Sequence, residues 1–387
     1  TFSVKEASNM VYADNAATTP LSPIAFEAMK PFLLSYFGNP SQPYSLSRPC
    51  KLALKKARED IAEYIHADPN EIYFTSGGTE SDNWAIKGSV LLNGNRGTII
   101  TSSIEHHAVL CSCRAMESHG HSVTYLPVSQ DGTVNLQNLQ SALTSKTGLV
   151  SIMLANNEIG TIEPIELLAK AAHDNGALFH TDAVQAIGHI PVDVKVLDVD
   201  FLSASAHKFG GPKGIGFLYI KKGTGIGSFM DGGAQEKGIR AGTENVASIV
   251  GMAAALKERC SHIEQSMLLY DKENELLNEL QKNGLTVGED FLWNGNHDIL
   301  RHLPGIISLS FRGRDGEMIL HRLDLKGIII STGAACDSHR IQVSHVIDAI
   351  GVPKEYAKGT IRISLAQNIA DDELKAIAKA LVAIVTE

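Results

Sequence analysis

The sequence predicts an α/β fold, in which a mostly parallel seven-stranded sheet in a large domain accompanies a smaller α+β domain. Two observations carry this prediction. Between positions 72 and 220, short runs rich in β-branched residues alternate with stretches of helical periodicity. After position 247 the pattern changes to a long helical stretch, an irregular segment and two short strands. Alternation of strands and helices is typical of a parallel sheet covered by helices.

The large domain is predicted to span residues 16–260. Helical spacing of apolar residues occurs at Leu54, Ala57, Ile61 and Ile65, and again over 136–143. In such sheets ligands bind beyond the carboxyl ends of the strands, so chemically important residues are expected directly after strands. The seven predicted strands are 72–75, 98–101, 122–126, 149–154, 178–180, 201–203 and 215–220.

The small α+β domain is predicted to combine residues 1–15 with residues 261–387. A helical stretch over 248–282 leads into it, and an irregular Gly/Asn-rich segment follows over 283–296. Two short strands, 305–310 and 327–330, lie among further helical stretches.

Composition restricts the function classes. Of 387 residues, 44% are hydrophobic and 20% are charged, which is the balance of a globular protein. The net charge of −9 argues against direct binding of nucleic acid or of an anionic membrane, since these surfaces attract a basic face. Five thinly spread cysteines do not form a disulfide framework, and the polar segment 1–10 has no signal-peptide pattern. A cytoplasmic protein that spans no membrane is expected.

Lys208 and Asp182 are the first candidate functional residues. Lys208 lies in a loop of small residues, FLSASAHKFGGPKGIG, between two predicted strands. Lysine forms a Schiff base with an aldehyde cofactor such as pyridoxal 5'-phosphate (PLP). Asp182 directly follows an apolar strand, where it could keep a pyridinium nitrogen protonated. Each residue alone also fits a structural role, as a loop lysine or a helix N-cap.

Two further segments fit the same cofactor. In FTSGGTESDNWAIKG a strand enters a Gly-Gly turn and a helix leaves it, which is a natural phosphate cradle but also an ordinary capped turn. His106 follows a strand, where its flat ring could stack on a planar cofactor. The adjacent His106 and His107 point in different directions, so they are not expected to form a metal site.

Cys336 and Arg362 complete the candidate set. Cys336 lies in the polar, small-residue loop STGAACDSHR, whereas Cys111 and Cys113 in a predicted helix fit inert structural thiols. A metal site built from Cys336 with neighbouring histidines matches no structural zinc spacing, and no metal is expected. Arg362, in a predicted strand, could clamp a substrate carboxylate or form a salt bridge.

The chain resembles the cysteine desulfurases of the class V, fold-type I PLP enzymes, in the NifS- and IscS-like branch. The matching motifs run nearly end to end: YADNAATTP at 12–20, GNPS at 38–41, TSGGTESDN at 75–83, EHHAV at 105–109, NNEIG at 156–160, HTDAVQ at 180–185, SAHKFGGPKGIG at 205–216, RAGTEN at 240–245, STGAAC at 331–336 and GTIRISL at 359–365.

The resemblance implies PLP as cofactor, L-cysteine as substrate, the catalytic residues Lys208, His106 and Cys336, and Asp182 as a cofactor-binding residue. Lys208 would hold PLP and move the proton at the substrate α-carbon, while His106 would stack on the cofactor ring. Asp182 would pair with the ring nitrogen. Cys336, in the small domain, would attack the substrate sulfur, releasing L-alanine and keeping a persulfide for a sulfur-acceptor protein.

The resemblance also implies the remaining binding residues. Arg362 and Asn157 would bind the substrate, and a homodimer is expected because Thr243 would reach the cofactor phosphate of a partner subunit. The other cofactor contacts would be Gly78, Thr79, Asn157, Gln185, Ser205 and His207.

Two positions depart from the family pattern, at Gln42 to Tyr44 and at Ala234 in a glycine run. Neither departure touches an assigned role. A selenocysteine lyase or another class V aminotransferase is the alternative function, and the Cys336 loop favours desulfuration. The acceptor stays open among iron–sulfur cluster assembly, tRNA thiolation and DNA phosphorothioate modification. Relatives that feed an iron–sulfur scaffold often have a longer tail after the last helix.

Overall fold

The computed structural model describes residues 10–92, 97–332 and 343–387. The large sheet has the strand order β2-β8-β7-β6-β5-β3-β4, and only β8 runs against its neighbours. The prediction of a mostly parallel seven-stranded sheet is therefore confirmed. Its strands are β2 (Ile72–Thr75), β3 (Thr98–Ser102), β4 (Val123–Leu126), β5 (Thr147–Ser151), β6 (Leu178–Asp182), β7 (Phe201–Ser205) and β8 (Gly216–Ile220).

Helices cover both faces of this sheet, which explains why its central strands β5, β6 and β7 are almost entirely buried. Alternate residues point to opposite cores: Ile99 faces α3 and α4, whereas Ile100 faces α2, α5, α6 and α8. The helices of this part are α1 (Pro23–Leu34), α2 (Arg48–Tyr64), α3 (Gly78–Leu92), α4 (His107–Ser118), α5 (Leu136–Ala142), α6 (Ile165–Asp174), α7 (Val194–Leu197) and α8 (Val246–Cys260).

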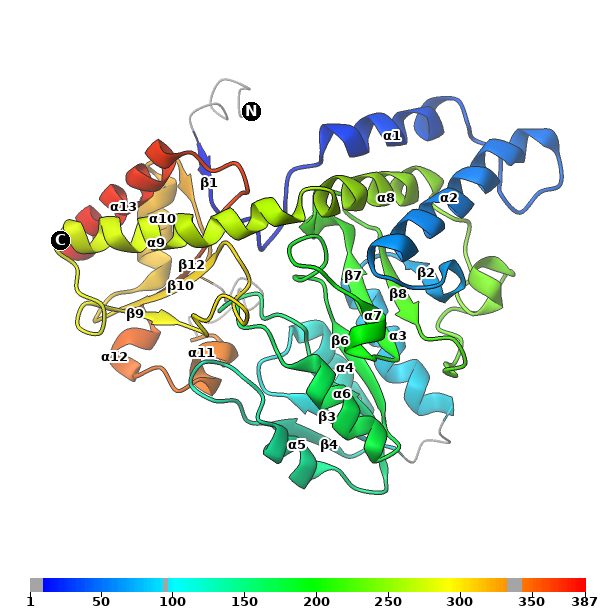
Figure 1. The fold of residues 1–387 in the computed structure, drawn as a ribbon, viewed down its shortest axis with the longest axis horizontal. Helices are drawn as coiled ribbons and strands as arrows, with labels where there is room; N and C mark the ends of the chain where they lie inside the picture. The colour runs from blue at the N-terminus through cyan, green and yellow to red at the C-terminus, as the bar shows by residue number, and fades with distance from the viewer. Residues whose placement is uncertain (1–9, 93–96, 333–342) are drawn as a thin grey trace.

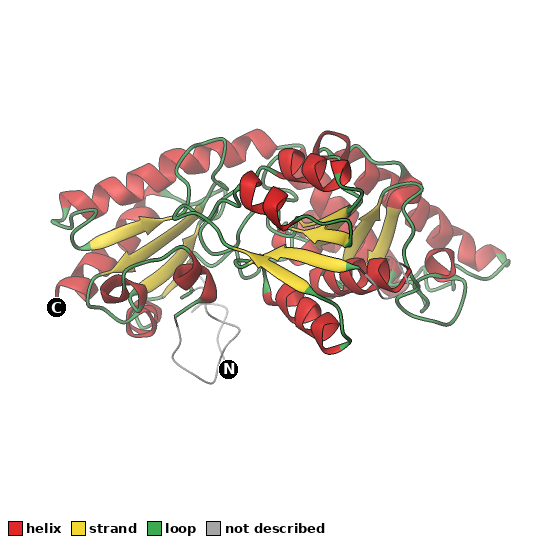
Figure 2. Cartoon of the chain, turned by 90° about the horizontal axis from the view of Figure 1, so that it is seen from below, coloured by secondary structure: helices red, strands yellow, loops and turns green. Residues whose placement is uncertain are grey.

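A second hydrophobic core surrounds a smaller antiparallel sheet of order β12-β10-β9. Figure 1 shows the two sheets in separate lobes, with α8 and α9 running in line along one side, and Figure 2 shows the two groups of strands toward opposite ends of the molecule. The elements of this part are α9 (Leu268–Lys282), β9 (Phe291–Asn294), β10 (Ile306–Phe311), α10 (Gly316–Asp324), β11 (Ile328–Ile329), α11 (His345–Ala349), α12 (Lys354–Ala357), β12 (Thr360–Ser364) and α13 (Asp371–Thr386).

The segment after residue 10 connects the two cores. Strand β1 (Val11–Tyr12) pairs in parallel with β11, and Asn15 Nδ2 donates to the carbonyl of Ser364 over 2.9 Å. Ala13 packs in the second core, whereas Ala16 packs in the first. The predicted domain boundaries, at 15/16 and 260/261, stay predictions.

Three details of the sequence-based assignment were wrong. The helical stretch over 248–282 is interrupted between α8 and α9, where 3-10 helix η6 (Ile263–Met267) stands. The segment 283–296 contains strand β9. Cys113 is buried as expected, but Cys111 is exposed and therefore does not fit a buried structural thiol. Among the described residues, no helix is both long and apolar enough to cross a membrane.

Candidate active site

A cavity of about 620 Å³ opens beyond the carboxyl ends of the parallel strands. Its walls come from segments that directly follow β2, β3, β5, β6 and β7, as expected for a ligand site in such a sheet. Ten of the predicted site residues line this one cavity: Gly78, Thr79, His106, Asn157, Asp182, Gln185, Ser205, His207, Lys208 and Arg362.

Lys208 ends the single 3-10 turn η4 (Ala206–Lys208) that follows β7. Its ammonium donates to the carbonyl oxygens of Ala16 and Ala17, over 2.6 and 3.0 Å. Gln185 Nε2 donates to the same Ala16 carbonyl over 2.9 Å. His189 fixes the lysine backbone, because its Nε2 donates to the Lys208 carbonyl over 2.9 Å. The lysine head is thus directed to the segment that joins the two cores.

Asp182 is the last residue of β6 and is 5% exposed. Its Oδ1 accepts a hydrogen bond from the Val184 N–H over 2.9 Å. Burial raises the pKa of Asp182, while this hydrogen bond and the nearby Lys208 charge oppose the shift. A cation placed against Asp182 would therefore be strongly favoured.

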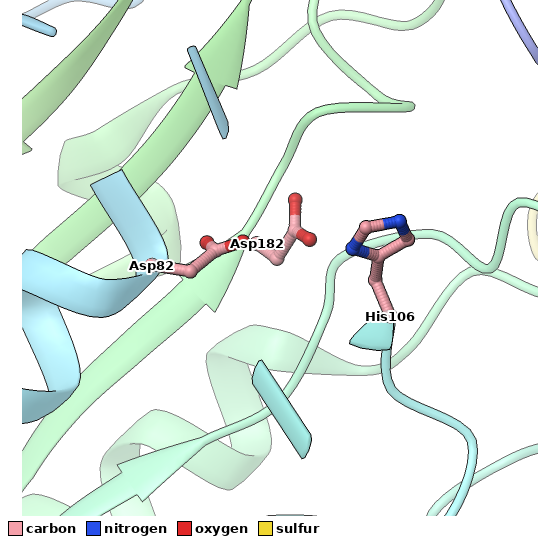
Figure 3. Close-up of side chains that lie close together, drawn as sticks. All are labelled: Asp82, His106 and Asp182. Atoms are coloured by element: carbon pink, nitrogen blue, oxygen red, sulfur yellow. The ribbon is translucent and has the colours of Figure 1, made fainter. Parts of the chain in front are cut away.

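His106 caps the N-terminus of α4, and its Nδ1 accepts from the Ala108 N–H over 3.1 Å. Burial, then the charge of Lys208, lowers the pKa of His106 to about 4, so the ring is neutral at neutral pH. Because Nδ1 is an acceptor, the ring proton lies on Nε2. Asp182 lies between Asp82 and His106 (Figure 3).

The turn after β2 has the form of an anion cradle. Helix α3 begins at Gly78, so its first N–H groups and its dipole face the cavity. A Cβ at Gly78 would lie 2.6 Å from Val184 Cγ2, and Gly77 has a φ of 148°. Glu80 Oε2 accepts from the Ser76 N–H over 2.8 Å, which fixes the turn. His207, opposite this turn, shares a 3.2 Å contact with the Thr18 hydroxyl.

Arg362 lies on β12 and is 4% exposed. Its Nη2 contacts Asp14 Oδ1 over 2.8 Å, and its Nη1 donates to the Asn157 carbonyl over 2.9 Å. Its Nε has no hydrogen-bond partner among the described residues. A buried guanidinium in the wall of a cavity can bind an anionic ligand such as a carboxylate.

Two predicted residues are not placed in this cavity. Thr243 is exposed and lies outside the cavity lining, so its predicted role depends on a second subunit. Cys336 lies outside the described residues.

Sequence reasoning assigned no role to three buried acids of the cavity wall, Asp82, Glu105 and Glu158. A signal for Asp82 exists in the sequence. Asp82 shares the helical stripe of Ala85 and Ile86, so a carboxylate interrupts an otherwise apolar face of α3. Burial raises the pKa of Glu105 to about 8 and that of Glu158 to about 7.

The fold and this cavity define an α/β enzyme with a lysine, a buried carboxylate and an anion cradle at the sheet edge. The family model described as Aminotransferase class-V matches residues 11–377. A cysteine desulfurase IscS of Dictyoglomus turgidum is 50% identical over 369 residues, which cover 94% of this chain and 91% of that protein.

Solved structures agree with these matches. A NifS-like protein has a TM-score of 0.90 and 37% identity, covering 97% of this chain and 99% of its own. SspA, solved in complex with cysteine, has a TM-score of 0.80 and 35% identity, covering 92% and 98%. The chain therefore belongs to the class V aminotransferase family and, within it, to the cysteine desulfurases. This family implies PLP as the cofactor.

Proposed function

We propose that the protein removes sulfur from L-cysteine with the help of PLP, leaving L-alanine and a persulfide on Cys336. The observation that carries this proposal is the placement of Lys208, Asp182 and Arg362 around one cavity. Lysine, carboxylate and guanidinium are the groups that an amino-acid substrate and PLP require. The similarity to cysteine desulfurases favours this reaction over transamination or selenocysteine cleavage.

The residues of the cavity fit PLP. Lys208 would bond to it, Asp182 would pair with its ring nitrogen, and His106 would stack on its ring. The N–H groups at the start of α3 would bind its phosphate, and Gly78 lets Val184 pack against this turn. When bound, PLP supplies an electron sink that stabilises negative charge on the substrate. The remaining predicted contacts are Thr79, Asn157, Gln185, Ser205 and His207, with Thr243 from a second copy.

Side chains of the protein bind the substrate, transfer its proton and accept its sulfur. Arg362 holds the substrate carboxylate, and the Lys208 amine moves the proton at the substrate α-carbon. The Cys336 thiolate attacks the substrate sulfur, so a new S–S bond forms as the carbon–sulfur bond breaks. We place this reaction in a reducing cytoplasm, where Cys336 stays a thiol until it acts and an acceptor protein removes the persulfide sulfur.

The test compares two cysteine variants. Cys336→Ala is expected to keep the yellow colour of bound PLP. Its rate of sulfide release from cysteine is expected to fall by about 100-fold or more, because the nucleophile is missing. Cys111→Ala is the matched control, because Cys111 is an exposed thiol outside the cavity wall. Undiminished sulfide release by the Cys336 variant would exclude the persulfide mechanism.

We also propose a homodimer in which a second copy covers the apolar side of α1. Large side chains on and after this helix are exposed, among them Leu33 at 60%, Leu34 at 72% and Phe37 at 78%. Grouped apolar side chains of this size are typical of protein interfaces. The second copy would also bring its Thr243 toward the phosphate cradle.

A further inference from the structure

A second carboxyl group, that of Asp82, is buried behind Asp182. Asp82 lies on α3 and is 1% exposed, while Asp182 is 5% exposed. One carboxylate oxygen of Asp82, one carboxylate oxygen of Asp182 and one ring nitrogen of His106 all lie within 4.8 Å of one another. The Asp82 side chain is directed toward Asp182, which separates it from His106 (Figure 3). Two acids therefore lie together where PLP needs one negative charge.

Among the residues that the structure describes, the groups around Asp82 do not supply a matching cation. Its Oδ1 lies 3.6 Å from His180 Nε2 and has no hydrogen-bond partner among the described residues. The two ring nitrogens of His180 are already engaged by serine hydroxyls, those of Ser151 at 2.8 Å and Ser203 at 3.0 Å. Burial lowers the pKa of His180 to about 3, so this ring is neutral at neutral pH.

Other polar and charged groups on this side of the sheet act differently on the two acids. Ser203 hydrogen-bonds Asp82, and the fully buried carboxyl of Glu105 adds a third acid nearby. The positive charge of Lys208 acts on Asp182. Within the described part of the chain, the cavity therefore has more buried acids than cations to balance them.

We propose that Asp82 is a positioning residue that holds a proton beside Asp182, so that the pair carries one negative charge toward the cofactor ring nitrogen. This inference rests on the proposed function. Two buried carboxylates at this separation repel each other, and one of them keeps a proton. Val184 N–H and Lys208 favour the anion at Asp182, so the proton belongs to Asp82.

The consequence is a match of charge at the base of the cavity. One protonated ring nitrogen meets one carboxylate, and no second buried charge is left without a partner. Burial, followed by the charge of Asp182, raises the pKa of Asp82 well above its usual range, which agrees with this assignment.

The first test is infrared spectroscopy of the full-length protein, with PLP bound and after its removal. At neutral pH the carbonyl band of protonated carboxyl groups is expected to lose the intensity of about one group in Asp82→Asn. Asp174→Asn is the matched control, since Asp174 is 65% exposed and should leave the band unchanged. An unchanged band in Asp82→Asn would overturn the proposal.

The second test is the pH dependence of unfolding. Between about pH 4, the pKa of an unfolded aspartate, and the raised pKa in the fold, the folded protein keeps a proton that the unfolded chain has lost. Each such proton raises the unfolding constant about tenfold per pH unit as pH rises. Asp82→Asn is expected to reduce the slope of the logarithm of the unfolding constant against pH by the equivalent of one proton. Equal slopes in the variant and the wild-type protein would contradict the assignment.

Asp182→Asn gives an independent check if the first variant does not fold. Without the Asp182 charge, Asp82 should release its proton at a pH lower by about one unit or more, seen as a shift of the carbonyl-band titration. A divalent metal bound between the two acids, found by elemental analysis, would also overturn the proposal. These measurements do not depend on turnover, so they separate this inference from a failure of the Cys336 mechanism.

Discussion

Arg362 is held from two sides before any substrate is present. The Arg362 guanidinium binds the Asp14 carboxylate through Nη2 and the Asn157 carbonyl through Nη1. The Arg362 backbone also exchanges two hydrogen bonds with Ser331, over 2.6 and 3.0 Å. A fixed fork loses little conformational entropy when it binds a carboxylate. Asp14 is therefore a positioning residue for substrate binding.

Asp14→Asn is expected to raise KM for cysteine about tenfold while kcat changes much less, because a charge-assisted hydrogen bond is weakened and the reacting atoms are untouched. Steady-state kinetics across cysteine concentrations gives the two constants. Asp174→Asn, at an exposed ion pair with Lys170, is the control. If kcat alone fell, the positioning role of Asp14 would be wrong.

At the scale of residues, the sequence predicted the members of the cavity better than their surroundings. Lys208 and Asp182 were predictable because each lies at or just after the end of a strand, and parallel strands end at one edge. The proximity of Asp82 to Asp182 was not predictable, because it depends on how α3 lies on the sheet. The Asp14 contact joins residues 348 positions apart and has no local signal.

Among the elements, the start of α3 is closely packed at the cavity. Gly78 begins the helix where Val184 approaches from the segment after β6. Any side chain at this position must displace Val184 or the turn, and the N–H groups that face the cavity move with it.

Gly78→Ala is expected to weaken PLP binding on the order of tenfold, because overpacking typically costs about 1–3 kcal/mol. The dissociation constant can be measured by the absorbance of bound cofactor. Gly97→Ala is the matched control, since its Cβ would meet ordinary contacts at 3.5 Å outside the cavity. Equal PLP affinity in the two variants would show that the turn adapts.

Strand prediction succeeded where burial on both faces favoured consecutive large apolar residues, as at 149–150 in β5 and 201–202 in β7. Strand β9 was missed because its four residues lie between Gly288 and Gly295, and its pairing with β10 is what stabilises it. Helix α8 ends at Cys260, where no proline marks the end and the polar Ser261 and His262 follow. Tertiary packing rather than local sequence decides such boundaries.

For the whole molecule, the proposed dimer can be tested at one surface, the exposed apolar side of α1 and the residues that follow it. Leu34→Lys combined with Phe37→Lys is expected to give a monomer in sedimentation experiments, because two charges would enter an apolar interface. Leu325→Lys is the control, since Leu325 is 88% exposed at the end of α10 in the other lobe. A variant with the mass of the wild-type protein would place the interface elsewhere.

The segment 11–17 has a consequence for the order in which the molecule is completed on the ribosome. Its early residues bond to partners such as Ser364, which is synthesised 349 positions after Asn15, and its carbonyl groups orient Lys208. Contacts of such high sequence separation form late. Both walls of the cavity therefore come together only after strand β12, which carries Arg362 and Ser364, has left the ribosome. Cofactor capture then reports that synthesis has passed this strand.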